Sequence, residues 1–285
     1  MEMVKARLIP LAALTLLAFS CTQKAYEYSW EKFRMDGHRT GVTVPNADNV
    51  AQALGVVGGD VYTAPNGRTF PKGSATYAVA ADMIGVQDQM ARVKEVIGHA
   101  PAAMVRRAPE SELSNWLVDR MMVDVARLTK HKVDVGITNF GGIRVDMPEG
   151  DVIMDDLLSM FPFRNYLVYV ALKGSDLQAI FDYMAKTRVQ VLGGVKLVVD
   201  GDQVESVLIG GKPLDPKKTY GVATNDFLLD GGDGLTVGKN ARELIVTDQT
   251  IIDAMLPYVR SLTEAGKPIA YQTDGRVVIK NKEGK

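Results

Sequence analysis

The stretch ATNDFLLDGGDG occupies residues 223–234 and leads from an apolar strand pattern into a glycine-rich acidic loop. Residues 220–223 favour a strand, and Phe227 comes soon after its end. The loop lacks the alternating carboxylates and the distal glutamate of an EF-hand, which disfavours that class of calcium site. A carboxylate beside glycines, such as Asp233, suits ribose hydroxyls, which need an acceptor in a tight space. Taken alone, the segment favours a surface turn.

Two further polar clusters lie beside predicted strands. Residues 138–144 read TNFGGIR, in which two glycines permit close approach of a ligand and Arg144 can hold a phosphate through two parallel hydrogen bonds. Residues 161–165 read FPFRN and precede the apolar run 167–172, which predicts a buried strand. Alone, the first cluster favours a glycine turn with a surface arginine, and the second favours core packing of the aromatic residue after Pro162 over an exposed stacking surface. Together, the three supply an arginine, two phenylalanines and an aspartate, the set that a nucleotide requires.

The rest of the chain alternates helical and strand patterns. Apolar periodicity predicts helices over 76–98 (ending at Gly98), 110–130 and 251–262, and another after a cap at Ser175. Strands are predicted at 133–137, 195–199 and 204–209, the last two joined as a hairpin through 200–202. The pattern has no strict βαβ rhythm, so we expect an α+β fold, a mixed β-sheet flanked by helices.

The first 21 residues resemble a bacterial lipoprotein signal peptide. A positively charged start precedes the apolar run 8–19, which is too short to span a bilayer as a stable anchor. Ser20 then precedes Cys21, the only cysteine, and lipidation of Cys21 would explain an unpaired thiol in an exported protein. An ordinary signal peptide with an incidental cysteine is the alternative. We expect export, attachment to the cell envelope through the lipid alone, and an irregular tether over residues 22–75.

Composition narrows the class of ligand. Hydrophobic residues make up 46% of the 285 residues, enough to build a core without disulfides. The net charge of −1 disfavours nucleic acid as a partner, because neutralising many phosphates requires a basic surplus. A nucleotide ligand would therefore be held by a few well-placed arginines.

From roughly Met83 to Lys280 the order and spacing of these clusters resemble the C-terminal domain of the 5′-nucleotidase and UDP-sugar hydrolase family. The matching blocks are residues 139–144, 156–163, 172–174 and 224–234. The resemblance implies a domain, residues 76–285, that binds a nucleotide or nucleoside substrate. It also implies the following substrate-binding residues: Phe163 and Phe227 for the base, Asp233 for the ribose, Arg144 and Arg107 (or its neighbour Arg106) for phosphate, and Asn139, Gly142, Asn165 and Gly194 (or Gly193) lining the site.

In that family the catalysis belongs to a metallophosphatase domain with two metal ions. Its Asp-x-His, Gly-Asp, Gly-Asn-His and Gly-His-x-His segments do not occur around the three histidines, His38, His99 and His131. The sequence therefore predicts no catalytic residue, no metal site and no cofactor in this chain, and divalent metals only in a partner metallophosphatase subunit. Three alternatives remain open: a non-catalytic nucleoside-binding lipoprotein, a structural protein that has lost its site, and a hydrolase with its own metal site.

Overall fold

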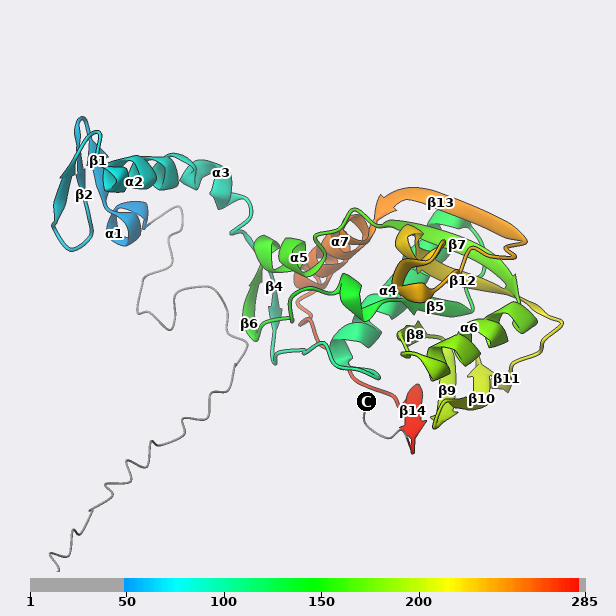
Figure 1. Ribbon diagram of the computed structural model, residues 1–285. Coiled ribbons are helices and arrows are strands. Elements are labelled where there is room, and N and C mark those ends of the chain that lie inside the picture. Colours follow the sequence, from blue (N-terminus) through cyan, green and yellow to red (C-terminus); the bar gives the residue numbers. More distant parts are fainter. Residues whose placement is uncertain (1–48, 282–285) are drawn as a thin grey trace, which may run out of the picture. The chain divides into compact units, whose positions relative to one another are not determined.

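The computed structural model describes residues 49–281 (Figure 1). The predicted signal peptide, the predicted lipidation site Cys21 and residues 22–48 of the predicted tether lie outside the described residues. Within the described part, no helix combines the length and the apolar character needed to cross a membrane.

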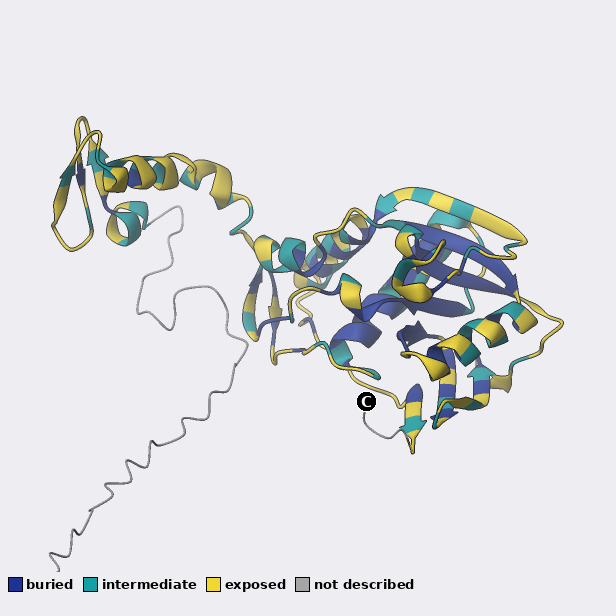
Figure 2. Cartoon of the chain, viewed as in Figure 1, coloured by how far each residue is buried: buried dark blue, intermediate teal, exposed yellow. Residues whose placement is uncertain are grey.

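A five-stranded mixed sheet forms the centre of the fold. Its order is β13-β7-β12-β5-β8; β12 runs parallel to β5, and every other neighbouring pair is antiparallel. The apolar run at 167–172 lies in β7 and is buried throughout, as predicted (Figure 2). The strands are β5 (Val135–Thr138), β7 (Tyr166–Lys173), β8 (Val191–Gly193), β12 (Thr219–Asn225) and β13 (Glu243–Thr250).

Helices pack on both faces of this sheet. Side chains of α4, α5 and α7 form one core with Leu167, Tyr169 and Ala223, whereas α6 packs with Val168 and Val170 on the opposite face. The alternation of buried side chains along β7 thus divides the core in two, and the predicted α+β class is confirmed. The helices are α4 (Glu112–Thr129), α5 (Met154–Met160), α6 (Gly174–Lys186) and α7 (Ile251–Glu264).

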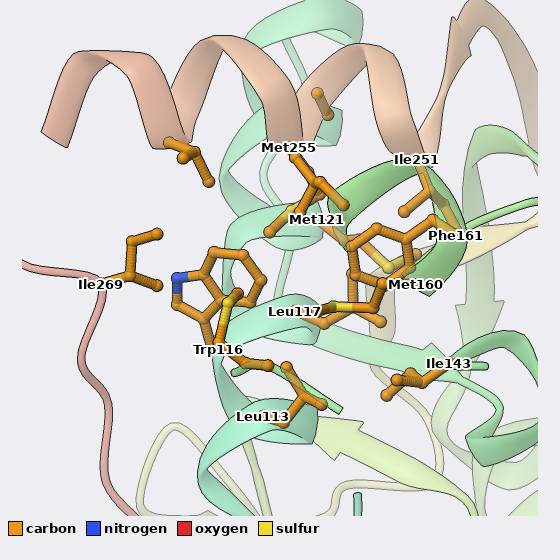
Figure 3. Close-up of a cluster of buried hydrophobic side chains, with 14 of the residues drawn as sticks. Leu113, Trp116, Leu117, Met121, Ile143, Met160, Phe161, Ile251, Met255 and Ile269 are labelled. Carbon is orange, nitrogen blue, oxygen red and sulfur yellow. The ribbon is translucent and has the colours of Figure 1, made fainter. Parts of the chain in front are cut away.

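The helix predicted over 110–130 is α4. Ser111 and Ser114 form a reciprocal capping box at its start, and Lys130 ends it with a positive φ of 60°. Its apolar stripe packs against α7, with Trp116 and Met121 near Met255 and Ile269 (Figure 3).

The start of α6 differs from the prediction. The sequence predicts Ser175 as the cap, but the helix begins at Gly174 and has no side-chain cap. The backbone N–H groups of Gly174 and Ser175 instead donate to the carbonyls of Lys218 and Pro216. A neighbouring loop therefore satisfies donors that the sequence pattern assigns to a serine.

The predicted hairpin belongs to a second sheet, of four strands in the order β11-β10-β9-β14. Gly201 makes the turn between β9 and β10 with a φ of 60°, a conformation that favours glycine. The C-terminal strand β14 pairs in parallel with β9. The strands are β9 (Val195–Asp200), β10 (Gln203–Ile209), β11 (Lys212–Pro213) and β14 (Val277–Lys280).

Between residues 76 and 98, the prediction of one helix is wrong. Two shorter helices end before Arg92, and residues 96–100 form a strand that pairs with residues 150–153. Gly98 belongs to this strand rather than ending a helix: a Cβ there would lie 2.7 Å from Cδ1 of Ile269, so glycine permits close packing. The elements are α2 (Ala75–Gly85), α3 (Gln87–Ala91), β4 (Val96–Ala100) and β6 (Gly150–Ile153).

The described part of the predicted tether, residues 49–75, contains regular structure. Three short strands form an antiparallel sheet in the order β1-β2-β3. The sequence pattern allows short strands here but predicts no helix. The elements are α1 (Val50–Leu54), β1 (Val56–Gly58), β2 (Val61–Thr63) and β3 (Thr69–Pro71).

Candidate ligand-binding site

The three polar clusters meet where β5 and β12 of the five-stranded sheet end and β7 begins. We call this end of the strands the sheet edge. β5 and β12 are parallel, so their carboxyl ends, at Thr138 and Asn225, point to the same edge. β7 is antiparallel to β12, and Leu167 pairs with Asn225, so β7 begins where β12 ends. The segments 139–144, 161–165 and 226–234 are therefore neighbours in the fold. This edge is the candidate site.

The loop at 139–144 is held by side chains from two other segments. After β5 it forms a 3₁₀ turn, η1 (Phe140–Gly142). Arg106 Nη1 donates to the carbonyls of Ile143, at 2.6 Å, and Phe140, at 3.2 Å. The backbone N–H of Phe140 donates to the buried Gln190 Oε1 at 3.1 Å. The loop therefore has a fixed shape without contacts from a ligand.

Asn139 and Asp233 join two of the clusters directly. Asn139 Nδ2 donates to Asp233 Oδ2 at 2.7 Å across 94 positions of sequence. Asp233 lies in η3 (Gly232–Gly234), directly after two glycines. Its φ is 48°, and the residue is exposed to solvent. Asn139 is only 4% exposed, and its Oδ1 has no hydrogen-bond partner in the described structure. A buried amide oxygen without a donor is costly, which marks a position where a ligand or a rearrangement would supply one.

The glycines of the 139–144 loop make room for this amide. A Cβ on Gly142 would lie 2.9 Å from Asn139 Oδ1, and one on Gly141 would lie 3.2 Å from Asn139 Nδ2. Any side chain at position 142 would therefore displace the amide that orients Asp233. Gly142 thus contributes to the site by leaving space.

Two phenylalanine rings are open to solvent at this edge. Phe163 and Phe227 are each 46% exposed, whereas Phe161, two residues before Phe163, is 3% exposed. The core interpretation of the aromatic residue after Pro162 is therefore wrong, because Phe163 is the exposed ring. Phe227 lies in η2 (Asp226–Leu228), which is capped by Asn225 Oδ1. Exposed rings on anchored turns are suited to stacking on a planar ligand.

The side chain of Arg144 lies between the Gly141 carbonyl and the Phe163 ring. Its Cζ is 5.8 Å from the centre of the Phe163 ring, and its Nη1 is 3.4 Å from the Gly141 carbonyl oxygen. Arg107 is exposed and directly follows Arg106, which contacts the same loop. Asn165 is half-buried at the start of β7, where its carbonyl accepts from Ile251 N–H at 3.1 Å.

The structure does not bring Gly194 to the other candidates. Gly193 pairs with Gly136, so Gly194 lies near the beginning of β5, whereas Asn139 follows its end. Gly194 has a φ of 69°, and a Cβ there would overlap the Asp134 carbonyl. The positive φ and the close approach of the Asp134 carbonyl together explain why position 194 is a glycine.

Several residues that shape this edge were not among the predicted site residues. Arg106 appeared only as the alternative to Arg107, and Gln190 carried no recognisable pattern. Asp226 Oδ1 accepts from Tyr166 N–H at 3.0 Å and so ties the start of β7 to the end of β12. The Tyr183 hydroxyl lies against Gly234, where any side chain would collide with it. Only Asp226 lay in a cluster that the sequence singled out.

If this end of the sheet binds the nucleoside that the family resemblance implies, replacing Asn139 with alanine is expected to weaken that binding about tenfold, because Asp233 would lose the hydrogen bond that orients it. Calorimetric titration of the variant with a nucleoside would measure the change. The matched control is Asn240→Ala, which removes an exposed Asn–Asp hydrogen bond to Asp176 outside the three clusters. An unchanged affinity of Asn139→Ala would show that this hydrogen bond does not serve binding.

Comparisons with known proteins agree with this architecture. Residues 67–240 match the family model described as "5′-nucleotidase, C-terminal domain". Protein UshA of Yersinia enterocolitica is 32% identical over 163 residues, which are 54% of this chain and 29% of that protein. Cell wall protein Lmo0130 of Listeria monocytogenes is 31% identical over 189 residues, 60% of this chain and 24% of that protein.

A solved structure extends the likeness to the fold. The 5′-nucleotidase precursor of Thermus thermophilus superposes with a TM-score of 0.62 at 26% identity, covering 78% of this chain and 46% of that one. The chain thus spans less than half the length of each of these three proteins. The match over residues 67–240 shows that the chain belongs to the 5′-nucleotidase C-terminal domain family.

Proposed function

We propose that this protein binds a nucleotide or nucleoside at the sheet edge described above. The observation that carries the proposal is the Asn139–Asp233 hydrogen bond, which orients a carboxylate at the end of the sheet where the loops of two exposed phenyl rings also lie. In this arrangement Phe163 and Phe227 stack on the base, and Asp233 accepts hydrogen bonds from the ribose hydroxyls. An aromatic face is suited to any base, and a carboxylate is suited to a pair of hydroxyl donors.

Arg144 and Arg107 are proposed to bind the phosphate. Arg144 is exposed and has no carboxylate partner within residues 49–281, so its guanidinium is available to an anion. Its contact with the Phe163 ring would place a bound phosphate next to a stacked base. Guanidinium groups match phosphate oxygens through two parallel hydrogen bonds, which gives both affinity and orientation.

We place the chemical step on a separate metallophosphatase subunit that carries the divalent metals. Two observations support this assignment. Over residues 49–281, no three His, Cys, Asp or Glu side chains converge as a metal site would require. The two described histidines each lie beside a single carboxylate: His99 is 3.3 Å from Asp151, and His131 is 3.2 Å from Glu243. This donor set does not fit a two-metal centre, so we assign no catalytic residue within residues 49–281.

The proposed setting is the cell envelope, with the protein held by a lipid on Cys21. The sequence pattern around Cys21 motivates this location, and the similarity to a protein named for the cell wall supports it. The ligand would then be an extracytoplasmic nucleotide, and the proposed role is nucleotide catabolism.

Affinity purification from an envelope extract tests the partnership. Tagged protein is expected to retain a metallophosphatase, and the mixture is expected to release phosphate from 5′-AMP more slowly when Phe227→Ala replaces the wild type. Retention of no metallophosphatase, together with intact nucleoside binding, would favour the non-catalytic binding lipoprotein instead. Phosphate release by the highly purified protein alone, abolished by a chelator, would contradict the assignment of hydrolysis to a separate subunit.

A further inference from the structure

The helix α2 is apolar on most of its surface, yet it is hardly buried. Asp82 is its only charged residue, and Ala80 is its only buried one. Figure 2 shows the contrast with α4, because α2 and α3 are drawn mainly as exposed or half-buried whereas much of α4 is buried. A helix that is apolar nearly all round is normally enclosed by other structure, so a further surface is expected to cover α2.

Exposed apolar side chains in this segment repeat at the spacing of a coiled-coil seam. Val79, Met83, Val86 and Met90 follow one another at intervals of four, three and four positions, and they are between 36% and 58% exposed. Helical hydrogen bonds continue from α2 into α3, because Val86 N–H donates to the Asp82 carbonyl and Met90 N–H donates to the Val86 carbonyl. The four side chains therefore form one stripe, which suits packing against a second helix.

An apolar groove lies beside this stripe. Its volume is about 440 Å³, and its walls include Ala53 and Leu54 of α1, Tyr62 of β2, and Val79 and Met83 of α2. A flexible apolar side chain from a covering helix, such as a methionine, is suited to fill a groove of this kind.

The charges of the segment decide which kind of surface covers it. Helices that lie on membranes carry lysines and arginines on their polar face. Residues 75–91 contain no lysine or arginine, and their two charged residues are Asp82 and Asp88. This composition disfavours a lipid surface and a strongly charged protein. It favours another helix that is itself apolar and nearly uncharged, as this segment is.

We propose that the stripe on α2 and α3 packs against the same stripe of a second copy of this chain, in antiparallel orientation. With the two-fold axis at the middle of the stripe, Val79 faces Met90 of the second copy, and Met83 faces Val86 of the second copy. Each long, flexible side chain then meets a short one, which allows the seam to pack without voids. This inference does not depend on nucleotide binding.

Polar residues beside the stripe are compatible with this arrangement. In an antiparallel pair, Asp82 lies on the same side as Gln89 of the second copy, whose amide can donate to the carboxylate. On the other side, Ala80 lies near Gln87 of the second copy. Asp88 is on the helix face opposite the stripe. No two like charges therefore face each other across the seam.

Sedimentation velocity of the purified protein at increasing concentration tests the proposal. We expect a concentration-dependent dimer that Val79→Lys weakens at least about tenfold, because the variant places a charge in the apolar seam. Val123→Lys is the matched control: Val123 is a 56% exposed valine of α4, close to the 58% of Val79, and its variant should dimerise like the wild type. Thermal unfolding verifies that both variants fold.

Single cysteines in a Cys21→Ser background, which removes the only native thiol, test the orientation. A mixture of Val79→Cys and Met90→Cys is expected to form a mixed disulfide on oxidation. Val79→Cys alone is expected to form none, because its two copies would lie about 16 Å apart along the helices, too far for a disulfide. Efficient cross-linking of Val79→Cys with itself would contradict the antiparallel arrangement.

Two results would overturn the proposal as a whole. One is a wild type that stays monomeric at every concentration, and the other is a Val79→Lys variant that dimerises as well as Val123→Lys. Vesicles of phosphatidylethanolamine and phosphatidylglycerol complete the test in the Cys21→Ser background. If a monomeric protein bound them and Val79→Lys abolished this binding, the stripe would belong to a lipid surface instead.

Discussion

Replacing both Phe163 and Phe227 with alanine is expected to abolish measurable nucleoside binding. Each base–aromatic stack contributes roughly 1–3 kcal/mol, so the two rings together would account for about 2–6 kcal/mol of affinity. Both rings are 46% exposed, so their removal leaves the buried core intact and is expected to leave the unfolding temperature nearly unchanged. Calorimetric titration with adenosine and uridine, combined with thermal unfolding, measures both quantities.

Leu244→Ala provides the control for this experiment. Leu244 is 43% exposed, similar to the two rings, but it lies in β13 outside the three loops of the site. Its variant should bind nucleosides like the wild type. If the double phenylalanine variant binds as tightly as Leu244→Ala, the base does not stack at these rings, whatever else the site does.

Arg276→Ala is expected to lower the free energy of unfolding by about 3 kcal/mol, the lower end of what breaking a buried ion pair costs. Arg276 is 8% exposed and donates to both carboxylate oxygens of Asp119, at 2.7 and 2.8 Å, and to the Leu192 carbonyl. These bonds fasten the segment before β14 to α4 and β8. Alanine would leave Asp119, which is 28% exposed at its side chain, without this partner.

Urea-induced unfolding of the variant tests this expectation, with Arg260→Ala as its control. Arg260 pairs with Glu95 at 2.8 Å, but both side chains are largely exposed, so its loss is expected to cost below about 1 kcal/mol. Similar losses for the two variants would show that burial does not strengthen the Arg276 cluster.

The Arg276 contribution is also expected to depend on pH. The hydrogen bond from Arg276 holds the pKa of Asp274 below its ordinary value of 3.8. A carboxyl group whose pKa is lowered by folding stabilises the protein above its unfolded pKa, and this stabilisation disappears as the pH falls through the folded pKa. The difference in unfolding free energy between wild type and Arg276→Ala should therefore shrink below about pH 4. A constant difference from pH 7 to pH 3 would contradict this linkage.

Elements with a strong local pattern could be predicted from the sequence. In α4 the stripe of Leu113, Leu117, Met121 and Val125 repeats at helical spacing, and in β7 the run 167–172 is apolar throughout. The prediction of one helix over 76–98 failed because apolar residues continue at helical spacing past the point where the chain leaves the helix. Its strand β4 depends on pairing with β6, whose residues lie fifty or more positions later in the sequence, and no local pattern reveals this pairing.

The position of the candidate residues in the fold was predictable where they belong to glycine-containing clusters. Asn139, Gly142, Phe227 and Asp233 fall at strand ends that the sheet topology brings to one edge. Gln190 and Tyr183 were missed because each acts on a loop distant in sequence, through a hydrogen bond or a packing contact. Gly194 was assigned to the site by resemblance alone, whereas its positive φ and its place near the start of β5 show a backbone requirement.

This chain by itself is expected to recognise a nucleoside or nucleotide. Calorimetric titration of the purified protein with adenosine, AMP, uridine and UDP-glucose tests this expectation most directly. We expect saturable one-to-one binding of at least one of these ligands, weakened by Asp233→Ala. A cooperatively folded protein that binds none of the four would contradict the proposed recognition.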